Sequence, residues 1–552
     1  DCLLSRGLGD VYKRQNFVQY RGRHKILPCI CLLLLGCTSD VKEFEQQVFR
    51  YNEFRNITSL DPAFARNPQN IWPIQQLFNG LVQLDDSLNI QPEIADAWEI
   101  STDGKTYTFS LREDVYFHNS IVFGSDKTRA VTAEDFVFSF DRLKDEKTGS
   151  PGGWVLQNVE RYTAIDKHTL QIELKQAFPA FLGLLTMRYC AVVPHEGVEY
   201  YKEDFRANPI GTGPFQFKKW EEDVKLVLRK NKRYFEKDSL GQQLPYLEAI
   251  AIRFLPDIQS EFMLFTQGKF DFLNSLDTSY KDDLLTPQGE LQEKYQEHIR
   301  MEKGPYLNTE YIGFYLEADN KAVQSRKIRK AMNIGFDRKK MILFLRNTIG
   351  FPAFQGFIPE GLPGHGDQNL NEYNPKMAQA LVQEFIEEHN EQPKIRLATD
   401  VNYLDICEYL QRAYQNIGIE VTIDLMPTAT LRQAKSSGNL ESFRASWIAD
   451  YPDAENYLSL FNSKNFSPSG PNYTHFTSTE FNELYQETMT VSNPEERIGL
   501  YKKMDRLMMS QYPIIPLYYD QAIRFTRKNV QGLEMNAINL LNLKKVRKTT
   551  KR

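Results

Sequence analysis

The 552-residue sequence is poor in the residues that build redox and metal centres. It holds six cysteines and eight histidines, and no Cys-x-x-Cys pair occurs. His195-Glu196 lacks the second histidine that a zinc-binding helix needs, and Gly124–Thr128 only resembles the end of a phosphate-binding Walker loop. A Gly-x-Ser-x-Gly nucleophile motif is also missing. We therefore expect no metal site, no cofactor and no enzymatic activity.

An excess of positive charge is missing as well. The chain has 67 Lys and Arg against 72 Asp and Glu, a net charge of −5, so we expect no nucleic-acid partner. The one basic run lies at the C-terminus and comprises Lys544, Lys545, Arg547, Lys548, Lys551 and Arg552. Two interpretations stay open for it: a solvated tail, or a contact with anionic lipid headgroups.

Long apolar runs are scarce, and the clearest spans residues 26–35, after the basic segment 21–25. It is too short to cross about 30 Å of hydrocarbon, so we expect a cleaved signal rather than a transmembrane helix. Its end, Leu34-Leu35-Gly36-Cys37, resembles a bacterial lipobox. We therefore predict that Cys37 is lipidated and becomes the first mature residue. An ordinary secretory signal and a buried apolar segment are the alternatives.

We expect the N-terminal residues to lie outside the folded domains. No methionine precedes Met187, and Asp10–Gln15 resembles translated adapter sequence, so residues 1–15 are expected to be foreign to the protein. Residues 37–48 are polar and are predicted to be a tether.

Few cysteines remain once the signal is removed. They are Cys37, Cys190 and Cys407, so after lipidation at most one disulfide is possible. Their spacing does not decide whether Cys190 and Cys407 bond. Apolar residues at helical spacing around Cys407 favour a buried free thiol there.

Local patterns in the first half predict both strands and helices. Alternating apolar residues predict a strand over 106–112, and Thr132 with Asp135 predicts a capping box at a helix start. Residues 215–220 and 224–229 are expected to pair as an antiparallel hairpin.

The second half changes character. Strand, helix and strand patterns over 394–425 predict a βαβ unit. Further helices are expected to begin at Asn374-Pro375, at Thr477 and at Asn493-Pro494. Together these signals predict an α/β protein with several lobes.

Short segments along the chain follow an order that is typical of one family. They include Gly211–Phe215 (Gly-Thr-Gly-Pro-Phe), Trp447–Asp453 (Trp-Ile-Ala-Asp-Tyr-Pro-Asp) and residues 77–82, 92–98, 107–112, 131–136, 328–332, 417–421 and 512–519. In order and number they resemble the family 5 bacterial extracellular solute-binding proteins, the peptide-binding subunits of ABC importers. The matching segments span almost the whole chain after the signal.

The resemblance implies an α/β, periplasmic-binding-protein-like clamshell of type II, with two lobes and an extra inserted domain. Strands near 311–317 and 517–522 are expected to be the hinge. The expected parts are residues 1–36 (foreign residues and lipoprotein signal), 37–48 (tether), 49–84 with 208–311 and 520–548 (domain I), 85–207 (inserted domain II) and 312–519 (domain III, the opposite lobe).

The resemblance also implies ligand-binding residues. Asp450 stands in Trp-x-Ala-Asp-Tyr, where oligopeptide binders of the family hold the peptide's α-amino group. Its alternative role is to cap the next helix, for which Asp453 is better placed. Arg444 is expected to meet a peptide carboxylate, or to form a structural salt bridge instead. Trp447 is expected to wall a side-chain pocket, or to pack in the core.

Two features depart from the family pattern: an insertion at residues 119–130, and Ala454 where a proline is common. They leave the peptide's length and identity open.

From the resemblance we expect a lipid-anchored, monomeric receptor in the bacterial cell envelope, on the periplasmic or outer face of a membrane. It would capture extended peptides between its lobes and deliver them to an ABC permease and ATPase complex. The first alternative is the same fold binding a nickel chelate, opine, haem or sugar. An envelope hydrolase, and a structural or signalling lipoprotein, are further alternatives.

Overall fold

A computed structural model describes residues 47–274, 277, 280–491 and 493–549 of the protein. The predicted signal, the lipidation site at Cys37 and nearly all of the predicted tether lie outside the described residues. The described residues from 47 onward belong to one compact unit. In the part of the chain that is described, no helix has the length and apolarity to cross a bilayer.

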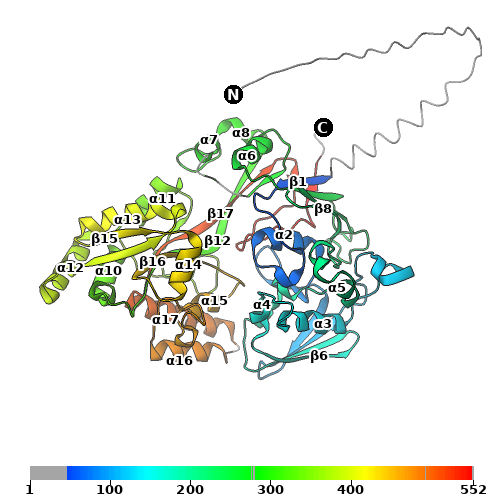
Figure 1. The fold of residues 1–552 in the computed structure, drawn as a ribbon, viewed down its shortest axis with the longest axis horizontal. Helices are drawn as coiled ribbons and strands as arrows, with labels where there is room; N and C mark the ends of the chain where they lie inside the picture. The colour runs from blue at the N-terminus through cyan, green and yellow to red at the C-terminus, as the bar shows by residue number, and fades with distance from the viewer. Residues whose placement is uncertain (1–46, 275–276, 278–279, 492, 550–552) are drawn as a thin grey trace, which may run out of the picture. The chain divides into compact units, whose positions relative to one another are not determined.

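The first lobe is built on two four-stranded sheets (Figure 1). One has the order β1 (Val48–Asn52), β10 (Ala249–Arg253), β9 (Lys225–Lys230) and β8 (Phe215–Glu221); the other has the order β4 (Ala95–Ile100), β5 (Thr106–Leu111), β7 (Thr169–Leu174) and β6 (Val159–Asp166). The predicted strand near 106–112 and the antiparallel hairpin of β8 and β9 are confirmed.

Helices and short strands complete the first lobe. They are α2 (Pro68–Leu77), α3 (Ala133–Lys144), α4 (Phe181–Leu185), α5 (His195–Tyr201), β2 (Val82–Leu84) and β3 (Ile90–Pro92). The capping box predicted for α3 is confirmed, because the Thr132 amide donates to Asp135 Oδ2 over 2.9 Å. Phe136 and Phe140 on one face of α3 are buried in the lobe's core.

The second lobe is organised around a seven-stranded sheet. Its order is β11 (Phe272–Leu273), β17 (Ile514–Arg527), β12 (Ile299–Phe314), β16 (Ser442–Ile448), β14 (Lys394–Thr399) and β15 (Glu420–Leu425), with β13 (Phe351–Pro352) also on β17. The predicted βαβ unit is confirmed, since β14 and β15 pair in parallel across α13 (Leu404–Asn416).

Helices cover both faces of this sheet. They are α9 (Lys321–Gln324), α10 (Arg326–Ile334), α11 (Arg338–Arg346), α12 (Pro375–His389), α14 (Thr428–Ser436), α15 (Glu455–Leu458), α16 (Thr479–Thr488) and α17 (Pro494–Gln511). The helix starts predicted at Asn374-Pro375 and Asn493-Pro494 are confirmed. The start predicted at Thr477 is wrong by one residue, because Ser478 is the residue whose side chain caps α16.

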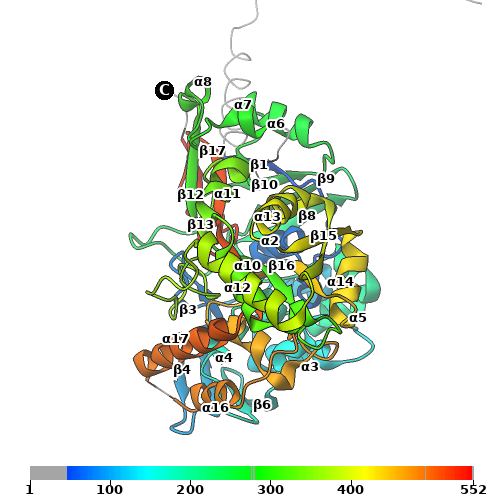
Figure 2. The same cartoon turned by 90° about the vertical axis from the view of Figure 1, so that its left-hand side faces the viewer.

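Two long strands, β12 and β17, run side by side from this sheet toward α6 (Ile258–Thr266), α7 (Lys281–Leu284) and α8 (Glu293–Gln296) in both views (Figures 1 and 2). The far end of β17 reaches the first lobe through Asp271, whose carbonyl accepts from the Arg527 amide and whose amide donates to the Arg50 carbonyl of β1. Their pairing shifts register between Pro305 and Thr309. A pair of crossing strands is the arrangement that lets two lobes move about one axis.

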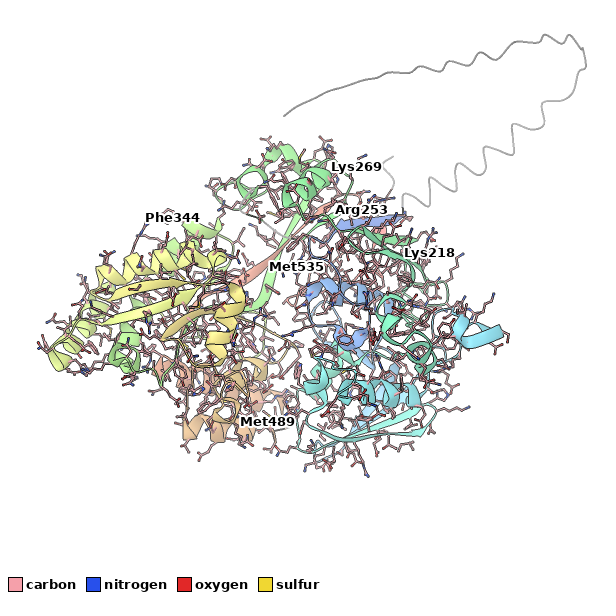
Figure 3. All side chains as sticks on the ribbon, viewed as in Figure 1. Lys218, Arg253, Lys269, Phe344, Met489 and Met535 are labelled. Carbon is pink, nitrogen blue, oxygen red and sulfur yellow. The ribbon has the colours of Figure 1, made fainter. Side chains whose placement is uncertain are left out.

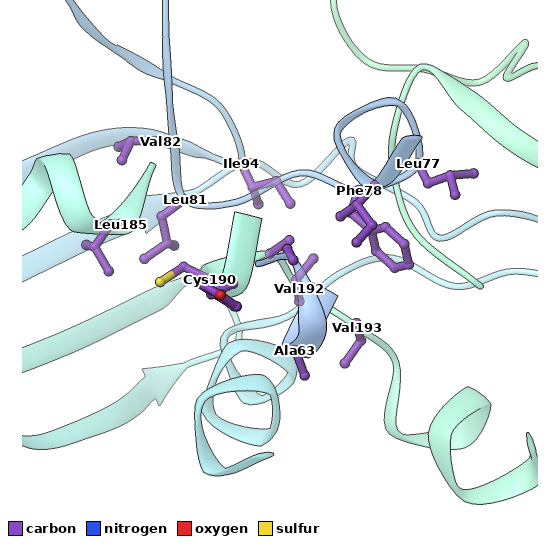
Figure 4. Close-up of a cluster of buried hydrophobic side chains, with 14 of the residues drawn as sticks. Ala63, Leu77, Phe78, Leu81, Val82, Ile94, Leu185, Cys190, Val192 and Val193 are labelled. Carbon is purple, nitrogen blue, oxygen red and sulfur yellow. The ribbon is translucent and has the colours of Figure 1, made fainter. Parts of the chain in front are cut away.

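The two described cysteines lie in separate cores. Cys190 is buried in the first lobe among Leu81, Leu185 and Val192 (Figure 4), and Cys407, on α13, is buried in the core of the second lobe. Both are free, so the buried thiol expected at Cys407 is confirmed and the two do not form a disulfide.

Both thiols are expected to be inert in the folded protein. Burial raises the pKa of Cys190 to about 12 and that of Cys407 to about 11, so almost no thiolate exists at about pH 8. A thiol-exchange reagent should therefore label neither residue until denaturant is added. Stoichiometric labelling of the native protein at either cysteine would contradict these placements.

The insertion at residues 119–130 forms a small excursion attached to the first lobe. Its base is closed by backbone hydrogen bonds from Phe117 to Arg129 and from Ser120 to Lys127. The Arg129 guanidinium then donates to Asp135 at the start of α3 and to Glu196 of α5. The excursion is therefore anchored by a partly buried charge network, while its residue Ile121 is exposed.

The C-terminal basic residues are only partly a solvated tail. Lys544 Nζ lies 2.6 Å from Glu236 Oε2, and Lys548 Nζ lies 2.8 Å from Asp271 Oδ1. Lys548 belongs to β19 (Arg547–Lys548), which pairs with β18 (Val530–Gln531). For these two lysines the tail interpretation is therefore wrong, and the charges are used within the protein.

Candidate functional site

The predicted ligand residues lie on and just after β16. Successive side chains of a strand point to opposite faces of the sheet, so Arg444 and Trp447 project from opposite faces of β16. Asp450 lies two residues beyond the end of the strand. The structure therefore separates Arg444 from the other two predicted residues.

Arg444 forms a buried ion pair. Its guanidinium bonds Glu310 of β12, and the two side chains are 7% and 3% exposed. Burial raises the pKa of Glu310, and the charge of Arg444 opposes that shift. The Tyr403 ring stacks on the guanidinium. The pair therefore lies in the sheet interior, which matches the salt-bridge alternative for Arg444.

An asparagine and a second, partly buried ion pair extend this network. Asn308 Nδ2 donates to Glu310 Oε1 over 3.1 Å, and Asp520 is bonded by Arg346 Nη2 over 2.9 Å. The four charged side chains come from β12, β16, β17 and α11, which explains why no sequence window contains the network.

Asp450 has no ion-pair partner among the described residues. Its side chain is open to solvent, yet the surrounding protein removes enough water to raise the pKa of its carboxyl, and a hydrogen bond from Asn456 opposes that shift. An accessible, partly desolvated carboxylate is suited to hold a cationic group by a charge-assisted hydrogen bond.

Asn456 of α15 joins Trp447 to Asp450. Its Oδ1 accepts from Trp447 Nε1 over 2.9 Å and from the Asp450 amide over 3.2 Å, while its Nδ2 donates to Asp450 Oδ2 over 3.4 Å. Sequence reasoning missed Asn456, because an asparagine inside a helical turn has no motif of its own. The first turn of α15 is capped by Asp453, whose Oδ1 accepts from the Glu455 amide over 2.9 Å.

Tyr451, the residue after Asp450, reaches from the second lobe into the first. Its ring packs in the core of the first lobe, 6.5 Å from the Phe178 ring and against Gly183. Its hydroxyl donates to Glu455, which also accepts from Tyr485. Burial raises the pKa of Glu455 to about 7. The residue after Asp450 is therefore a contact between the two lobes.

Two cavities lie along the seam where the lobes meet. One, of about 300 Å³, is lined by Ile90 and Gly183 of the first lobe and by Pro452 and Ala454 of the second. The other, of about 790 Å³, lies between β4–β5 and the end of α16, where Met489 marks its second-lobe wall (Figure 3). They share Pro179 and Arg497 as lining residues, so the seam holds room for a ligand beside the segment that follows Asp450.

Removing the Tyr451 ring is expected to loosen this seam. Tyr451→Ala deletes the contacts with Phe178 and Gly183 that join the lobes, so a more open population is expected. In solution X-ray scattering without added ligand, the variant should show a larger radius of gyration than the wild type. Tyr451→Phe, which keeps the ring, should resemble the wild type; equal radii for all three proteins would show that Tyr451 does not hold the lobes.

The described residues contain no group of three or more His, Cys, Asp or Glu arranged to hold a metal ion. The groups around Asp450 are its own carboxylate, the indole of Trp447 and the carboxamide of Asn456. Groups of this kind can bind and orient a ligand.

Comparisons with known proteins place this geometry in context. The family profile described as bacterial extracellular solute-binding proteins, family 5 Middle, matches residues 89–469. Two similar curated proteins are the dipeptide-binding protein DppE of Bacillus subtilis, 23% identical over 93% of this chain and 96% of DppE, and heme-binding protein A of Haemophilus influenzae, 29% identical over 83% of this chain and 84% of that protein.

A similar solved structure is the ABC transporter-associated periplasmic binding protein DppA from Helicobacter pylori in complex with the peptide STSA. It has a TM-score of 0.74 and 22% identity, and the match covers 92% of this chain and 99% of that one. This likeness confirms the two-lobed α/β clamshell. The two curated relatives are binding proteins whose names give different ligands, a dipeptide and haem.

Proposed function

Because the chain belongs to family 5 of the bacterial extracellular solute-binding proteins, we propose that it is the solute receptor of an ABC importer and that its solute is an extended peptide. The peptide is captured between the lobes and handed to a membrane permease and ATPase. The receptor performs no chemistry on it. The observation that carries this proposal is Asp450, a carboxylate at the seam that forms no ion pair with a cation in the described part of the chain.

Asp450 is the group that receives the peptide's α-amino group. An ammonium needs an anion when a closing cleft removes its water, and a charge-assisted hydrogen bond supplies this. Trp447, fixed through Asn456, forms an apolar wall beside the first peptide side chain.

An open strand edge supports capture of an extended backbone. β16 pairs with β12 from Ser442 to Ile448, whereas its pairing with β14 covers only Ser442 and Phe443. Among the described strands, residues 444–448 therefore have a ladder partner on one side alone. A peptide can add there as a further strand, and main-chain pairing tolerates many side chains.

Arg444 is the weakest of the proposed ligand contacts. A role at the peptide carboxylate requires it to leave Glu310, and both side chains are buried. The observations favour its structural alternative.

The proposal includes the location of the receptor. Lipidation at Cys37 anchors it to a membrane of the bacterial envelope, and it acts as a monomer, on the periplasmic or outer face. Labelling cells with a radioactive fatty acid tests the anchor: the wild type is expected to carry label and Cys37→Ser to carry none. Label on the serine variant would overturn the lipidation site.

A second candidate is a non-peptide solute in the same cleft, favoured by the 29% identity to a heme-binding protein. The experiment that separates the two is to purify the folded protein, denature it and identify the released molecules by mass spectrometry. A set of short peptides is the expected result. A single non-peptide species would be consistent with a solute receptor and would overturn the proposal that its solute is a peptide.

A further inference from the structure

The side chain of Asn456 is hydrogen-bonded to the proposed amine site rather than to its own helix. It is 4% exposed, and its carboxamide makes three hydrogen bonds. Two reach Asp450, one to the backbone and one to the side chain, and the third comes from the indole of Trp447. None of the three stabilises α15 itself, whose first turn is capped by Asp453.

We propose that Asn456 is the positioning residue of the amine site, which fixes the Asp450 carboxylate and the Trp447 ring relative to one another. This inference rests on the proposed function, in which Asp450 binds an α-amino group. Asn456 touches no ligand: its acceptor oxygen orients the indole, and its donor nitrogen stabilises the ionised carboxylate. A preoriented charge binds more tightly because less ordering is left for the binding step.

The two ends of the carboxamide have separable effects. A hydrogen bond donated to a carboxylate favours its charged form, and Asn456 lowers the pKa of Asp450 against the effect of burial. Without that donor the pKa of Asp450 rises. Only the ionised carboxylate attracts an ammonium, so affinity falls as acidification protonates Asp450. This fall, the acid limb of the plot of affinity against pH, then occurs at a higher pH.

Other titratable groups face Asp450, and they do not account for such a shift. Tyr189 of the first lobe and Tyr457 of α15 both interact with its charge, but burial raises the pKa of Tyr189 to about 12 and raises that of Tyr457 well above its usual value. Both stay neutral through the acid range. Glu455 has a pKa of about 7, and its titration is common to wild type and variant, so the difference between profiles isolates Asp450.

The test compares Asn456→Ala, Asn456→Asp and the wild type, with trialanine as the probe. Calorimetry across a pH series gives the affinity and its acid limb. The indole N–H spectrum of protein with ¹⁵N-labelled tryptophan, assigned with Trp447→Phe, reports the hydrogen bond of Trp447. Asn462→Ala is the matched control, because Asn462 is also buried and its carboxamide bonds the Lys464 amide, outside the site.

Asn456→Ala is expected to shift the Trp447 signal, weaken trialanine binding about 10-fold and move the acid limb upward. Asn456→Asp keeps the acceptor, lacks the donor and adds a like charge beside Asp450, so the Trp447 signal should return toward that of the wild type while the acid limb stays displaced. Asn462→Ala should change none of the three readouts.

Identical Trp447 signals and acid limbs in wild type and Asn456→Ala would overturn the positioning role, and so would a Trp447 signal that is displaced equally in the aspartate and alanine variants. If wild-type protein does not bind trialanine, the peptide proposal fails separately, and the Trp447 signal still decides whether Asn456 orients the indole.

Discussion

Replacing Asp450 by asparagine is expected to weaken the binding of trialanine by about 100-fold, because the ligand's ammonium then enters a partly desolvated site without an opposing charge. Asparagine has the shape of aspartate and can still accept from Asn456, so the change removes the charge and little else. Calorimetry at neutral pH measures the loss, and thermal unfolding should show that the fold is intact.

The same substitution elsewhere in the lobe is the control. Asp337 caps α11, with its Oδ1 accepting from the Lys340 amide over 3.1 Å, and asparagine is an equally good cap. Asp337→Asn should bind trialanine like the wild type. An Asp450→Asn protein that binds as tightly as this control would remove Asp450 from the site.

Replacing Arg444 alone by methionine is expected to lower the free energy of unfolding by about 3–5 kcal/mol, because Glu310 is left buried without its partner. Urea denaturation of the variant measures this directly. Glu310 is 3% exposed, so water cannot take the place of the guanidinium without a change in the sheet.

A double variant separates the structural role from a ligand role. Glu310→Gln together with Arg444→Met removes both charges, and most of the lost stability should return. The recovered protein should bind trialanine and trialanine amide with the same ratio as the wild type. If the ratio changes with Arg444, the guanidinium meets the peptide carboxylate after all, and its pairing with Glu310 is not its main role.

Local elements could be predicted from the sequence because their causes are local. The capping box of Thr132 and Asp135, the hairpin of β8 and β9, and the βαβ unit over β14 and β15 each depend on residues close together in the chain. The error in the helix start predicted at Thr477 is local too, because Ser478 provides an equivalent capping hydroxyl one residue later.

The site could be predicted only in part, because its contacts are long-range. Asp450 and Trp447 were found through a motif, but the partner of Arg444 is Glu310, 134 residues earlier. Which face of β16 carries Arg444 depends on its register against β12. The role of Tyr451 between the lobes likewise depends on Phe178, which nothing near Tyr451 in the sequence indicates.

The central claim is that the protein holds a peptide by its free amine. The measurement that tests it most directly is calorimetry of the wild-type protein with trialanine and with N-acetyl-trialanine, which differ in that amine alone. Trialanine is expected to bind, and acetylation is expected to abolish or greatly weaken binding. Equal affinity for the two, or no affinity for trialanine beside tight binding of a non-peptide solute, would contradict it.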